Sequence, residues 1–274
     1  MEKYCPDALW HLAQPLLPEH PKRHQGGGRR RIDDRVALAA IVYVLDSGCA
    51  WNALPESFPI SSASAHRRFG EWVEHGVMAA LHRAALDVLG LAGRIDWSRA
   101  SIDAMHVRAV KGGPLTGPSP VDRGKRGSKV HAVSDRNGLP LHADISAANV
   151  NDHKVLEDVL DGMAPVRQPV GRPRKRPVKL HGDKGYDYRA CRQALTRRRI
   201  KARIARKGIE SSTRLGRYRY VIERCLEWVT RFRPLARRYE RKASHFRGFL
   251  RLACAIICYR RANRLNLLPS NNPK

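Results

Sequence analysis

The hydrophobic pattern of this chain of 274 residues changes character near Gly93. Before that point apolar residues recur at helical spacing in several short segments. After it, Ser101–Val107 alternates between polar and apolar residues, as a strand does. We therefore predict an all-α domain over residues 1–93 and a mixed α/β domain over residues 94–274.

The second part begins with a predicted hairpin and continues in alternating helices and strands. Lys129–Ser134 and Leu139–Ile145 are the expected strands, and Asp135–Gly138 between them is typical of a tight turn. The elements expected after the hairpin are a helix at Asp152–Leu160, a strand at Val178–His181, a helix at Tyr186–Arg197, a strand at Lys201–Ala205 and helices at Tyr218–Arg233 and His245–Asn263. Three strands followed by α/β units resemble a ribonuclease H-like fold.

The first part is expected to contain four helices. They are Asp7–Leu17, a helix from Asp33 or Asp34 to Ser47, a helix from Ser61 to Trp72, and Val77–Leu89. Helices of this size suit a helix-turn-helix, in which Ser61–Arg68 would be the recognition helix and His66, Arg67 and Arg68 would face DNA. A plain helical bundle whose third helix carries two arginines explains the pattern equally well.

Basic residues are concentrated in the last third of the chain. Lysine and arginine number 52 against 25 aspartates and glutamates, for a net charge of +27. Residues 171–264 hold 30 of the basic residues and 6 of the acidic ones. Such an asymmetric field attracts a polyanion, and the planar guanidinium of arginine suits phosphate. We therefore expect a nucleic-acid partner rather than a merely solvated surface, with the basic loop 171–177 contacting the DNA backbone.

Composition and pattern argue against several other classes of protein. No apolar run approaches the roughly 20 residues of a membrane span, and Met1–Pro6 lacks the apolar region of a secretory signal. The six cysteines form no CxxC pair, so neither a disulfide framework nor a zinc module is predicted. A reducing cytoplasm is the simplest location, and no membrane partner is expected.

Three acidic residues lie where a ribonuclease H-like fold could bring them together. Asp103 is inside the first predicted strand, Asp183 ends the fourth, and Glu223 lies on the late helix. A carboxylate within an apolar strand costs free energy unless it is paired or binds a metal. Three carboxylates from separate elements suit Mg²⁺ or Mn²⁺. Two such ions could activate a water or hydroxyl and stabilise the leaving oxygen of a phosphodiester.

Each of these acids also has a purely structural explanation. Asp103 could cap a turn, Asp183 could form a loop with a nearby glycine, and Glu223 could pair with Arg219 one helical turn back. The residue types alone leave these alternatives open.

Short motifs spread over nearly the whole chain match one family. In the first part they are Leu16–Pro18, Ile41–Leu45, Ser47–Trp51, Leu54–Pro55 and Arg67–Phe69. In the second part they are Ile102–Ala109, Arg126–Lys129, Asp135–Pro140, Ala148–Asp152, Gly182–Asp187, Arg219–Arg224 and Arg238–Arg241, of which Gly182–Asp187 is highly specific. With these motifs the sequence resembles bacterial insertion-sequence transposases of the DDE class, in the insertion-sequence-five group.

The resemblance implies that Asp103, Asp183 and Glu223 are the catalytic residues and hold two Mg²⁺ ions, with Mn²⁺ as the alternative. It ranks Glu223 above Glu227, the rival acid one turn further on, because the family motif places the glutamate before an arginine. Asp152 is predicted to be a helix cap or a loop residue. The 39 residues between Asp183 and Glu223 leave no room for the large insertion of some related transposases.

The sequence departs from the family signature at two helper positions. The signature has a tyrosine three residues before the arginine at position 219 and a basic residue seven after the glutamate. This chain has Gly216 and Thr230 there, so Tyr218 or Tyr220 would take the first role and Arg231 the second.

DNA contacts are expected from basic residues in these motifs and loops. They are Arg67, Arg68, Lys129, Arg172, Arg174, Lys175, Arg176, Lys184, Arg219, Arg224 and Arg231.

The predicted function is that of a DNA transposase. It would bind double-stranded DNA at the terminal inverted repeats through the N-terminal helices and the basic C-terminal helices. It would cleave the phosphodiester at the element ends by two-metal hydrolysis and join the 3′-hydroxyl ends to target DNA. Joining two ends calls for a homodimer or a higher synaptic oligomer, located with the nucleoid in the bacterial cytoplasm. The alternatives are a helix-turn-helix regulator without cleavage activity and a ribonuclease H-like nuclease.

Overall fold

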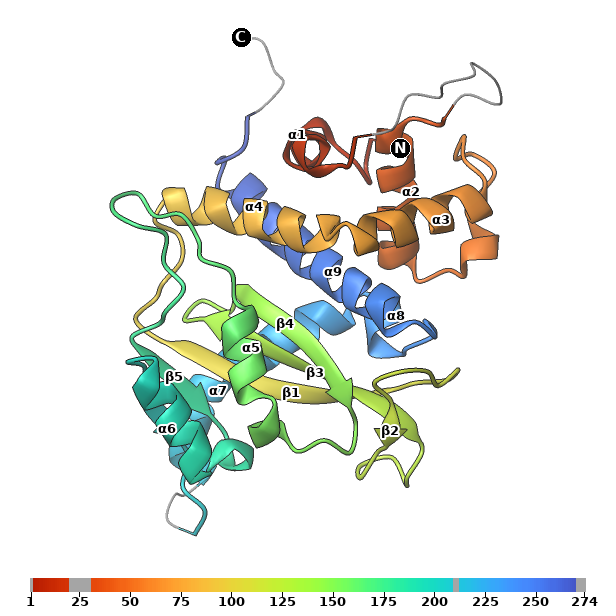
Figure 1. Ribbon diagram of the computed structural model, residues 1–274. Helices are drawn as coiled ribbons and strands as arrows, with labels where there is room; N and C mark the ends of the chain where they lie inside the picture. Colours follow the sequence, from red (N-terminus) through yellow and green to blue (C-terminus); the bar gives the residue numbers. More distant parts are fainter. Residues whose placement is uncertain (1, 20–30, 209–211, 270–274) are drawn as a thin grey trace.

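A mixed sheet of six strands forms the centre of the second part of the chain (Figure 1). The computed structural model describes residues 2–19, 31–208 and 212–269, with the backbone alone for 212–219. The strands are β1 (Ala100–Arg108), β2 (Gly117–Pro118), β3 (Arg126–Asp135), β4 (Pro140–Ala147), β5 (Lys179–Gly182) and β6 (Lys201–Ile204). The short strand β2 lies in the connection between β1 and β3.

The order of the long strands across the sheet is β4-β3-β1-β5-β6. β3 is antiparallel to both β1 and β4, whereas β5 and β6 run parallel to β1. An antiparallel trio extended by two parallel strands is the ribonuclease H-like topology, so the predicted α/β fold is confirmed.

The turn between β3 and β4 depends on the buried carboxylate of Asp135. It accepts hydrogen bonds from the backbone N–H groups of Asn137 and Leu139, both at 2.8 Å, and of Asp96 at 3.0 Å. Gly138 has a φ of +88°, a conformation that favours glycine. These features account for the predicted hairpin.

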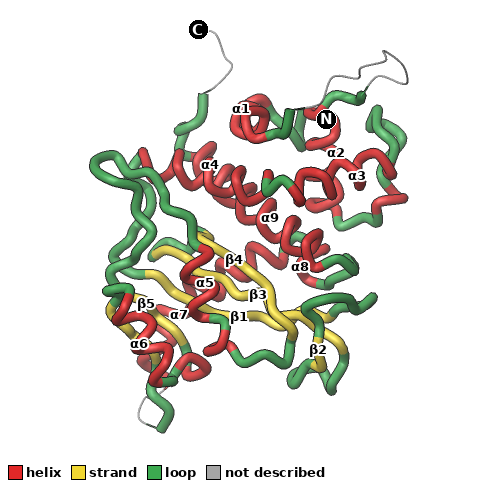
Figure 2. Tube along the Cα trace, in the orientation of Figure 1, coloured by secondary structure: helices red, strands yellow, loops and turns green. Residues whose placement is uncertain are grey.

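Helices cover both faces of the sheet (Figure 2). α5 (Leu156–Gly162) and α6 (Arg189–Arg197) pack in one hydrophobic cluster with Ile102 of β1. α7 (Ser212–Thr230) packs in the other cluster, and α8 (Arg233–Ala236) follows it. The predicted helix at Tyr218–Arg233 therefore starts earlier than expected and stops at Thr230.

The N-terminal helices are α1 (Asp7–Ala13), α2 (Asp34–Ser47), α3 (Ser62–Glu74) and α4 (Val77–Leu91). Of these, α3 and α4 pack on the long C-terminal helix α9 (Ala243–Arg264), whereas α1 packs on α4 and α2 on α3 and α8 (Figure 1). Phe69 of α3 stacks on Phe249 of α9, with 4.4 Å between ring centroids. A core shared with α9 therefore joins the two predicted domains. Among the described helices, none is both long and apolar enough to cross a membrane.

The helix-turn-helix interpretation of the first part needs correction. Residues 48–61 separate α2 from α3, and this connection contains a short 3₁₀ helix at Trp51–Ala53. A helix-turn-helix joins its two helices by only three or four residues. The prediction of a helical N-terminal part is confirmed, whereas a compact turn before the third helix is absent from this described segment.

Candidate active site

The pairing of β1 with β5 brings two of the predicted acids side by side. Ser101 is in register with His181 in this parallel pair, so Asp103 and Asp183 lie two residues further along their chains. Asp183 follows the end of β5 and caps a short 3₁₀ helix, where its Oδ1 accepts a hydrogen bond from the Gly185 N–H at 2.9 Å. Two residues with 79 others between them in sequence thus become neighbours at one point of the sheet.

The buried Tyr186 side chain lies within the electrostatic influence of several carboxylates. Burial raises the pKa of its hydroxyl well above the usual range, and the carboxylates of Asp152, Asp103 and Asp183 raise it further. The hydroxyl has no hydrogen-bond partner among the described residues. We call the three aspartates around it the carboxylate cluster.

Asp152 is the member of the carboxylate cluster that sequence reasoning missed. Its Oδ1 accepts a hydrogen bond from Lys129 Nζ at 2.8 Å, and Lys129 also donates to the Val150 carbonyl at 2.7 Å. A Cβ atom placed on Gly185 would lie 3.6 Å from Asp152 Oδ2 and 2.9 Å from Asp183 Oδ1. Asp152 is the last residue of the Ala148–Asp152 motif of the family. Its place in that motif is the sequence signal that could have marked it as a residue of the site.

The position of Lys129 corrects a prediction. Its side chain is only 6% exposed and pairs with Asp152, so it does not face solvent where a DNA backbone could reach it. Lysine is almost never buried without a partner. The lysine neutralises a carboxylate inside the site instead.

Glu223, the third predicted acid, is exposed on α7. This helix covers the sheet face that carries Asp103, because Asp103 pairs with Ala132 and Ala132 shares a hydrophobic cluster with Ile222 of α7. The rival Glu227 pairs with Arg231 at 2.9 Å on the exposed side of the helix.

The three predicted ligands are not gathered into one coordination shell. Within the described part of the chain, one group of three His, Cys, Asp or Glu side chains has its ligand atoms within 4.8 Å of one another, and it lies elsewhere. Asp103 and Asp183 nevertheless present hard oxygen donors beside an unsatisfied hydroxyl, and Gly185 leaves space next to them. This donor set fits a hard divalent cation such as Mg²⁺ or Mn²⁺.

The residues predicted to contact DNA differ widely in exposure. Arg67, Arg172, Arg176, Lys184 and Arg231 are exposed, and Arg174, Lys175 and Arg224 are half-buried. The side chain of Arg219 lies outside the described residues. The basic segment 171–177 contains no helix, as predicted, and Lys175 Nζ donates to the Asp161 carbonyl at 2.7 Å.

Arg68 is a second correction, because it faces the protein interior. It is 8% exposed, forms an ion pair with Asp34 and lies 3.6 Å from a carboxylate oxygen of Glu71. His66, also expected to face DNA, lies against Trp51, with ring centroids 4.9 Å apart. Of the three side chains assigned to DNA on this helix, only Arg67 is exposed.

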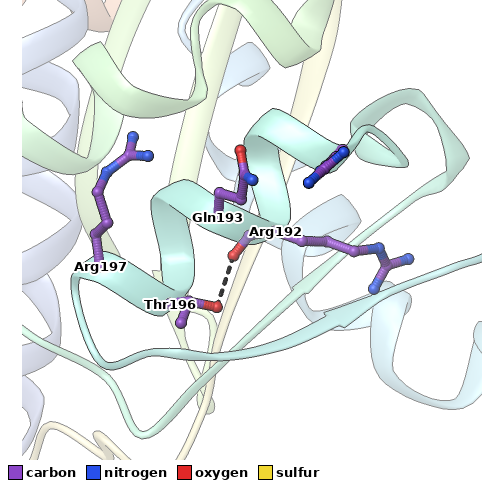
Figure 3. Close-up of a pocket in the computed structure, with 5 residues that line it drawn as sticks. Arg192, Gln193, Thr196 and Arg197 are labelled. Atoms are coloured by element: carbon purple, nitrogen blue, oxygen red, sulfur yellow. Dashed lines mark hydrogen bonds between the residues drawn. The ribbon is translucent and has the colours of Figure 1, made fainter.

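Sequence reasoning also missed the arginines on α6, the helix that follows the Asp183 loop. Figure 3 shows Arg192 and Arg197 extending from this helix in different directions, with Gln193 between them. Arg192 pairs with Asp187 at 2.6 Å and Arg197 with Glu157 at 2.9 Å. Arg192 and Arg197 line a surface pocket on this helix together with Arg189, Gln193 and Thr196.

Two protein-family models match this chain. A family model described as "Transposase DDE domain" matches residues 98–258, more than half of the chain. A second one, described as "Putative transposase of IS4/5 family", matches residues 5–82.

Two relatives and one solved structure complete the comparison. "Putative transposase for insertion sequence element IS402" from Burkholderia cepacia is 43% identical over 153 residues, which are 56% of this chain and 72% of the relative. "Putative transposase for insertion sequence element IS6501" from Brucella ovis is 28% identical over 134 residues, 48% of this chain and 98% of the relative. "Crystal structure of the Mos1 Strand Transfer Complex" covers 88% of this chain and 81% of its own at 14% identity, but its TM-score of 0.29 is too low to support an argument.

The chain belongs to the DDE transposase family of bacterial insertion sequences. This membership confirms the family resemblance that the sequence motifs indicated. The protein is a DNA transposase, an enzyme of DNA cleavage and strand transfer that depends on a divalent metal.

Proposed function

We propose that this transposase binds the terminal inverted repeats of its element, cleaves the phosphodiester at each end and joins the 3′-hydroxyls to target DNA. Asp103, Asp183 and Glu223 would hold two Mg²⁺ ions, which Mn²⁺ could replace. The observation that carries the proposal is the juxtaposition of Asp103 and Asp183 beside the buried Tyr186. When bound, the ions would supply a nucleophile at neutral pH and stabilise the leaving oxygen.

Other residues of the site would position the carboxylates. Lys129 offsets the charge of Asp152, and this ion pair lies against the loop that bears Asp183. Glu223 would join Asp103 and Asp183 from α7, which packs on the sheet face that carries Asp103.

DNA would run along the exposed basic residues near the site. Lys184 follows Asp183 directly, and Arg231 lies on the turn after α7. Arg67 on α3 and the loop residues Arg172 and Arg176 would contact phosphates further away. We assign this binding to residues 1–93 together with the basic helices of residues 94–274, acting as a homodimer or higher synaptic oligomer at the nucleoid in the cytoplasm.

The experiment that tests the proposal uses linear DNA carrying the gene with both of its flanks. The full chain is incubated with Mg²⁺ or Mn²⁺, and new 3′ ends are mapped at nucleotide resolution. Asp103→Asn and Asp183→Asn should each reduce cleavage by about a thousandfold, because each removes a charged metal ligand. DNA affinity should stay within about twofold, since neither residue is basic.

Glu227→Gln is the matched control for Glu223→Gln, because both glutamates are exposed on the same helix. Glu227→Gln should retain DNA cleavage, and Glu223→Gln should lose it. Equal losses, or continued cleavage by Asp103→Asn, would refute the ligand assignment. Binding without cuts would indicate a regulator, and cuts unrelated to the repeats would indicate a general nuclease.

A further inference from the structure

A second cluster of potential metal ligands lies away from the sheet, between the N-terminal helices and α9. His66 of α3, Glu240 of the segment after α8 and His245 in the first turn of α9 each offer one ligand atom. These three atoms all lie within 4.8 Å of one another. We call them the imidazole cluster; its members are up to 179 residues apart in sequence.

The carboxylate of Glu240 is already oriented by its neighbours. Its Oε1 accepts a hydrogen bond from Trp51 Nε1 at 3.0 Å, and its Oε2 lies 3.6 Å from His245 Nδ1. Ligands of protein metal sites are held in this way by outer hydrogen bonds that fix their orientation. One oxygen is therefore anchored, and the other faces an imidazole.

The two imidazoles are fixed by packing. His245 is 5% exposed and meets Phe69 edge to face, with ring centroids 5.4 Å apart. His66 lies 5.2 Å from His245 between ring centroids and also contacts Trp51. Burial lowers the pKa of His66 below its ordinary value. Imidazoles that packing already holds in place lose little entropy on binding an ion.

The imidazole cluster lines a cavity of about 970 Å³. The cavity leaves room for a water or another ligand to complete the coordination of an ion. Basic residues line it as well: Lys111, Arg233, Arg237, Arg241 and Lys242. These five residues are exposed, so water and salt weaken their repulsion of a cation but do not abolish it.

We propose that His66, Glu240 and His245 bind one divalent transition-metal ion of the zinc class. Two imidazole nitrogens and one carboxylate oxygen form a donor set that suits Zn²⁺ and Co²⁺, whereas Mg²⁺ prefers oxygen ligands alone. The ion would tie α3 to the first turn of α9, and thereby the N-terminal helices to the end of the chain. This site goes beyond the proposed cleavage function and shares no residue with it.

The test uses Co²⁺ as a spectroscopic probe on the full chain after treatment with a chelator. The buffer contains 0.15 M salt (roughly physiological ionic strength) and excess Mg²⁺, which occupies the carboxylate cluster. One equivalent of Co²⁺ should give the strong visible absorption of four-coordinate cobalt without a thiolate charge-transfer band. Saturating Zn²⁺ should raise the Tm by about 5 °C.

Variants of the three ligands separate a metal site from a purely structural hydrogen-bond network. His66→Ala, Glu240→Gln and His245→Ala should each weaken Co²⁺ binding at least about tenfold. Glu240→Gln keeps an oxygen for the Trp51 hydrogen bond, so its Tm in chelator should match that of the parent. His11→Ala, at an exposed histidine of α1, should bind Co²⁺ normally, and so should Asp103→Asn.

Several results would overturn the proposal. They are the absence of the visible band, unchanged Co²⁺ affinity in Glu240→Gln, or a thiolate band that shows binding through cysteine, such as Cys49 in the same cavity. None of these readouts depends on DNA cleavage. A failure here therefore leaves the cleavage proposal standing, and a loss of cleavage leaves this site untouched.

Discussion

The carboxylate cluster and the imidazole cluster are assembled in different ways. Asp103 and Asp183 become neighbours through strand register, which the hydrogen bonds of the backbone determine. His66, Glu240 and His245 meet because α3 packs on α9, so side-chain packing determines their distances. Backbone hydrogen bonds fix a strand register whatever side chains lie beneath it, whereas the distance between two helices varies with the side chains at their contact. We expect the imidazole cluster to be the more easily disturbed of the two.

The buried guanidinium of Arg238 connects the two regions. A substitution of Arg238 should have the largest effect of those that we predict. Arg238 donates to the Glu240 carbonyl at 2.9 Å and to Ser128 Oγ at 2.7 Å, next to Lys129 on β3. It also donates to the Pro114 carbonyl at 2.9 Å. Arg238→Met should lower the free energy of unfolding by about 3 kcal/mol, because several buried acceptors lose a charged donor. Urea denaturation measures this change.

Arg237→Met is the control for that variant, because Arg237 is exposed beside it and should change stability by less than about 0.5 kcal/mol. In Arg238→Met, Co²⁺ affinity should fall further than the rate of DNA cleavage does. A larger loss of cleavage would mean that the carboxylate cluster is the more sensitive of the two, contrary to the comparison.

The second prediction concerns His82 of α4, a buried histidine outside the imidazole cluster, and its effect on the stability of the protein at different pH values. Its Nε2 lies 2.8 Å from the Pro140 carbonyl. Burial, together with the charge of Arg251, lowers the pKa of His82 to about 4. The unfolded chain, with a pKa near 6.5, binds more protons between pH 4 and 6.5. Stability should therefore fall as the pH is lowered through that window, by up to about 3 kcal/mol at pH 4.

Urea denaturation at a series of pH values measures this loss. His82→Gln should remove the His82 contribution, so its stability should depend less steeply on pH between 6.5 and 4. A parent and a variant with parallel profiles would show that His82 titrates normally in the folded protein.

The smallest expected effect compares two adjacent arginines of α3. Arg67→Gln should weaken DNA binding a few-fold and reduce the salt slope by about one, because it removes a single exposed phosphate contact. Arg68→Gln should leave that slope unchanged and instead lower the Tm, because it breaks the buried ion pair with Asp34. Binding measured at several salt concentrations, with thermal unfolding in parallel, distinguishes the two residues. The reverse pattern would contradict the orientation of this helix.

Much of the fold could be predicted from local pattern. The alternation around Asp103 and the turn residues 135–138 are local signals, and the corresponding strands form where expected. The helix-turn-helix prediction was wrong because the length of the connection at 48–61 depends on how the helices pack. Hydrophobic periodicity carries no information about that packing. Asp152 and Lys129 were given separate roles because nothing in the sequence pairs residues 23 positions apart.

The sequence by itself determined the family and the order of the main strands and helices, and it supplied the three acids that we propose as metal ligands. These properties depend on motifs of a few residues and on the hydrophobic periodicity. Both can be recognised in the sequence without knowing which distant residues are in contact. Only the tertiary structure decided which basic side chains face solvent, that Asp152 joins the carboxylate cluster, and that His66 meets Glu240 and His245. The physical reason is that burial and long-range side-chain contact depend on how the elements pack together. That packing places residues from opposite ends of the chain against each other.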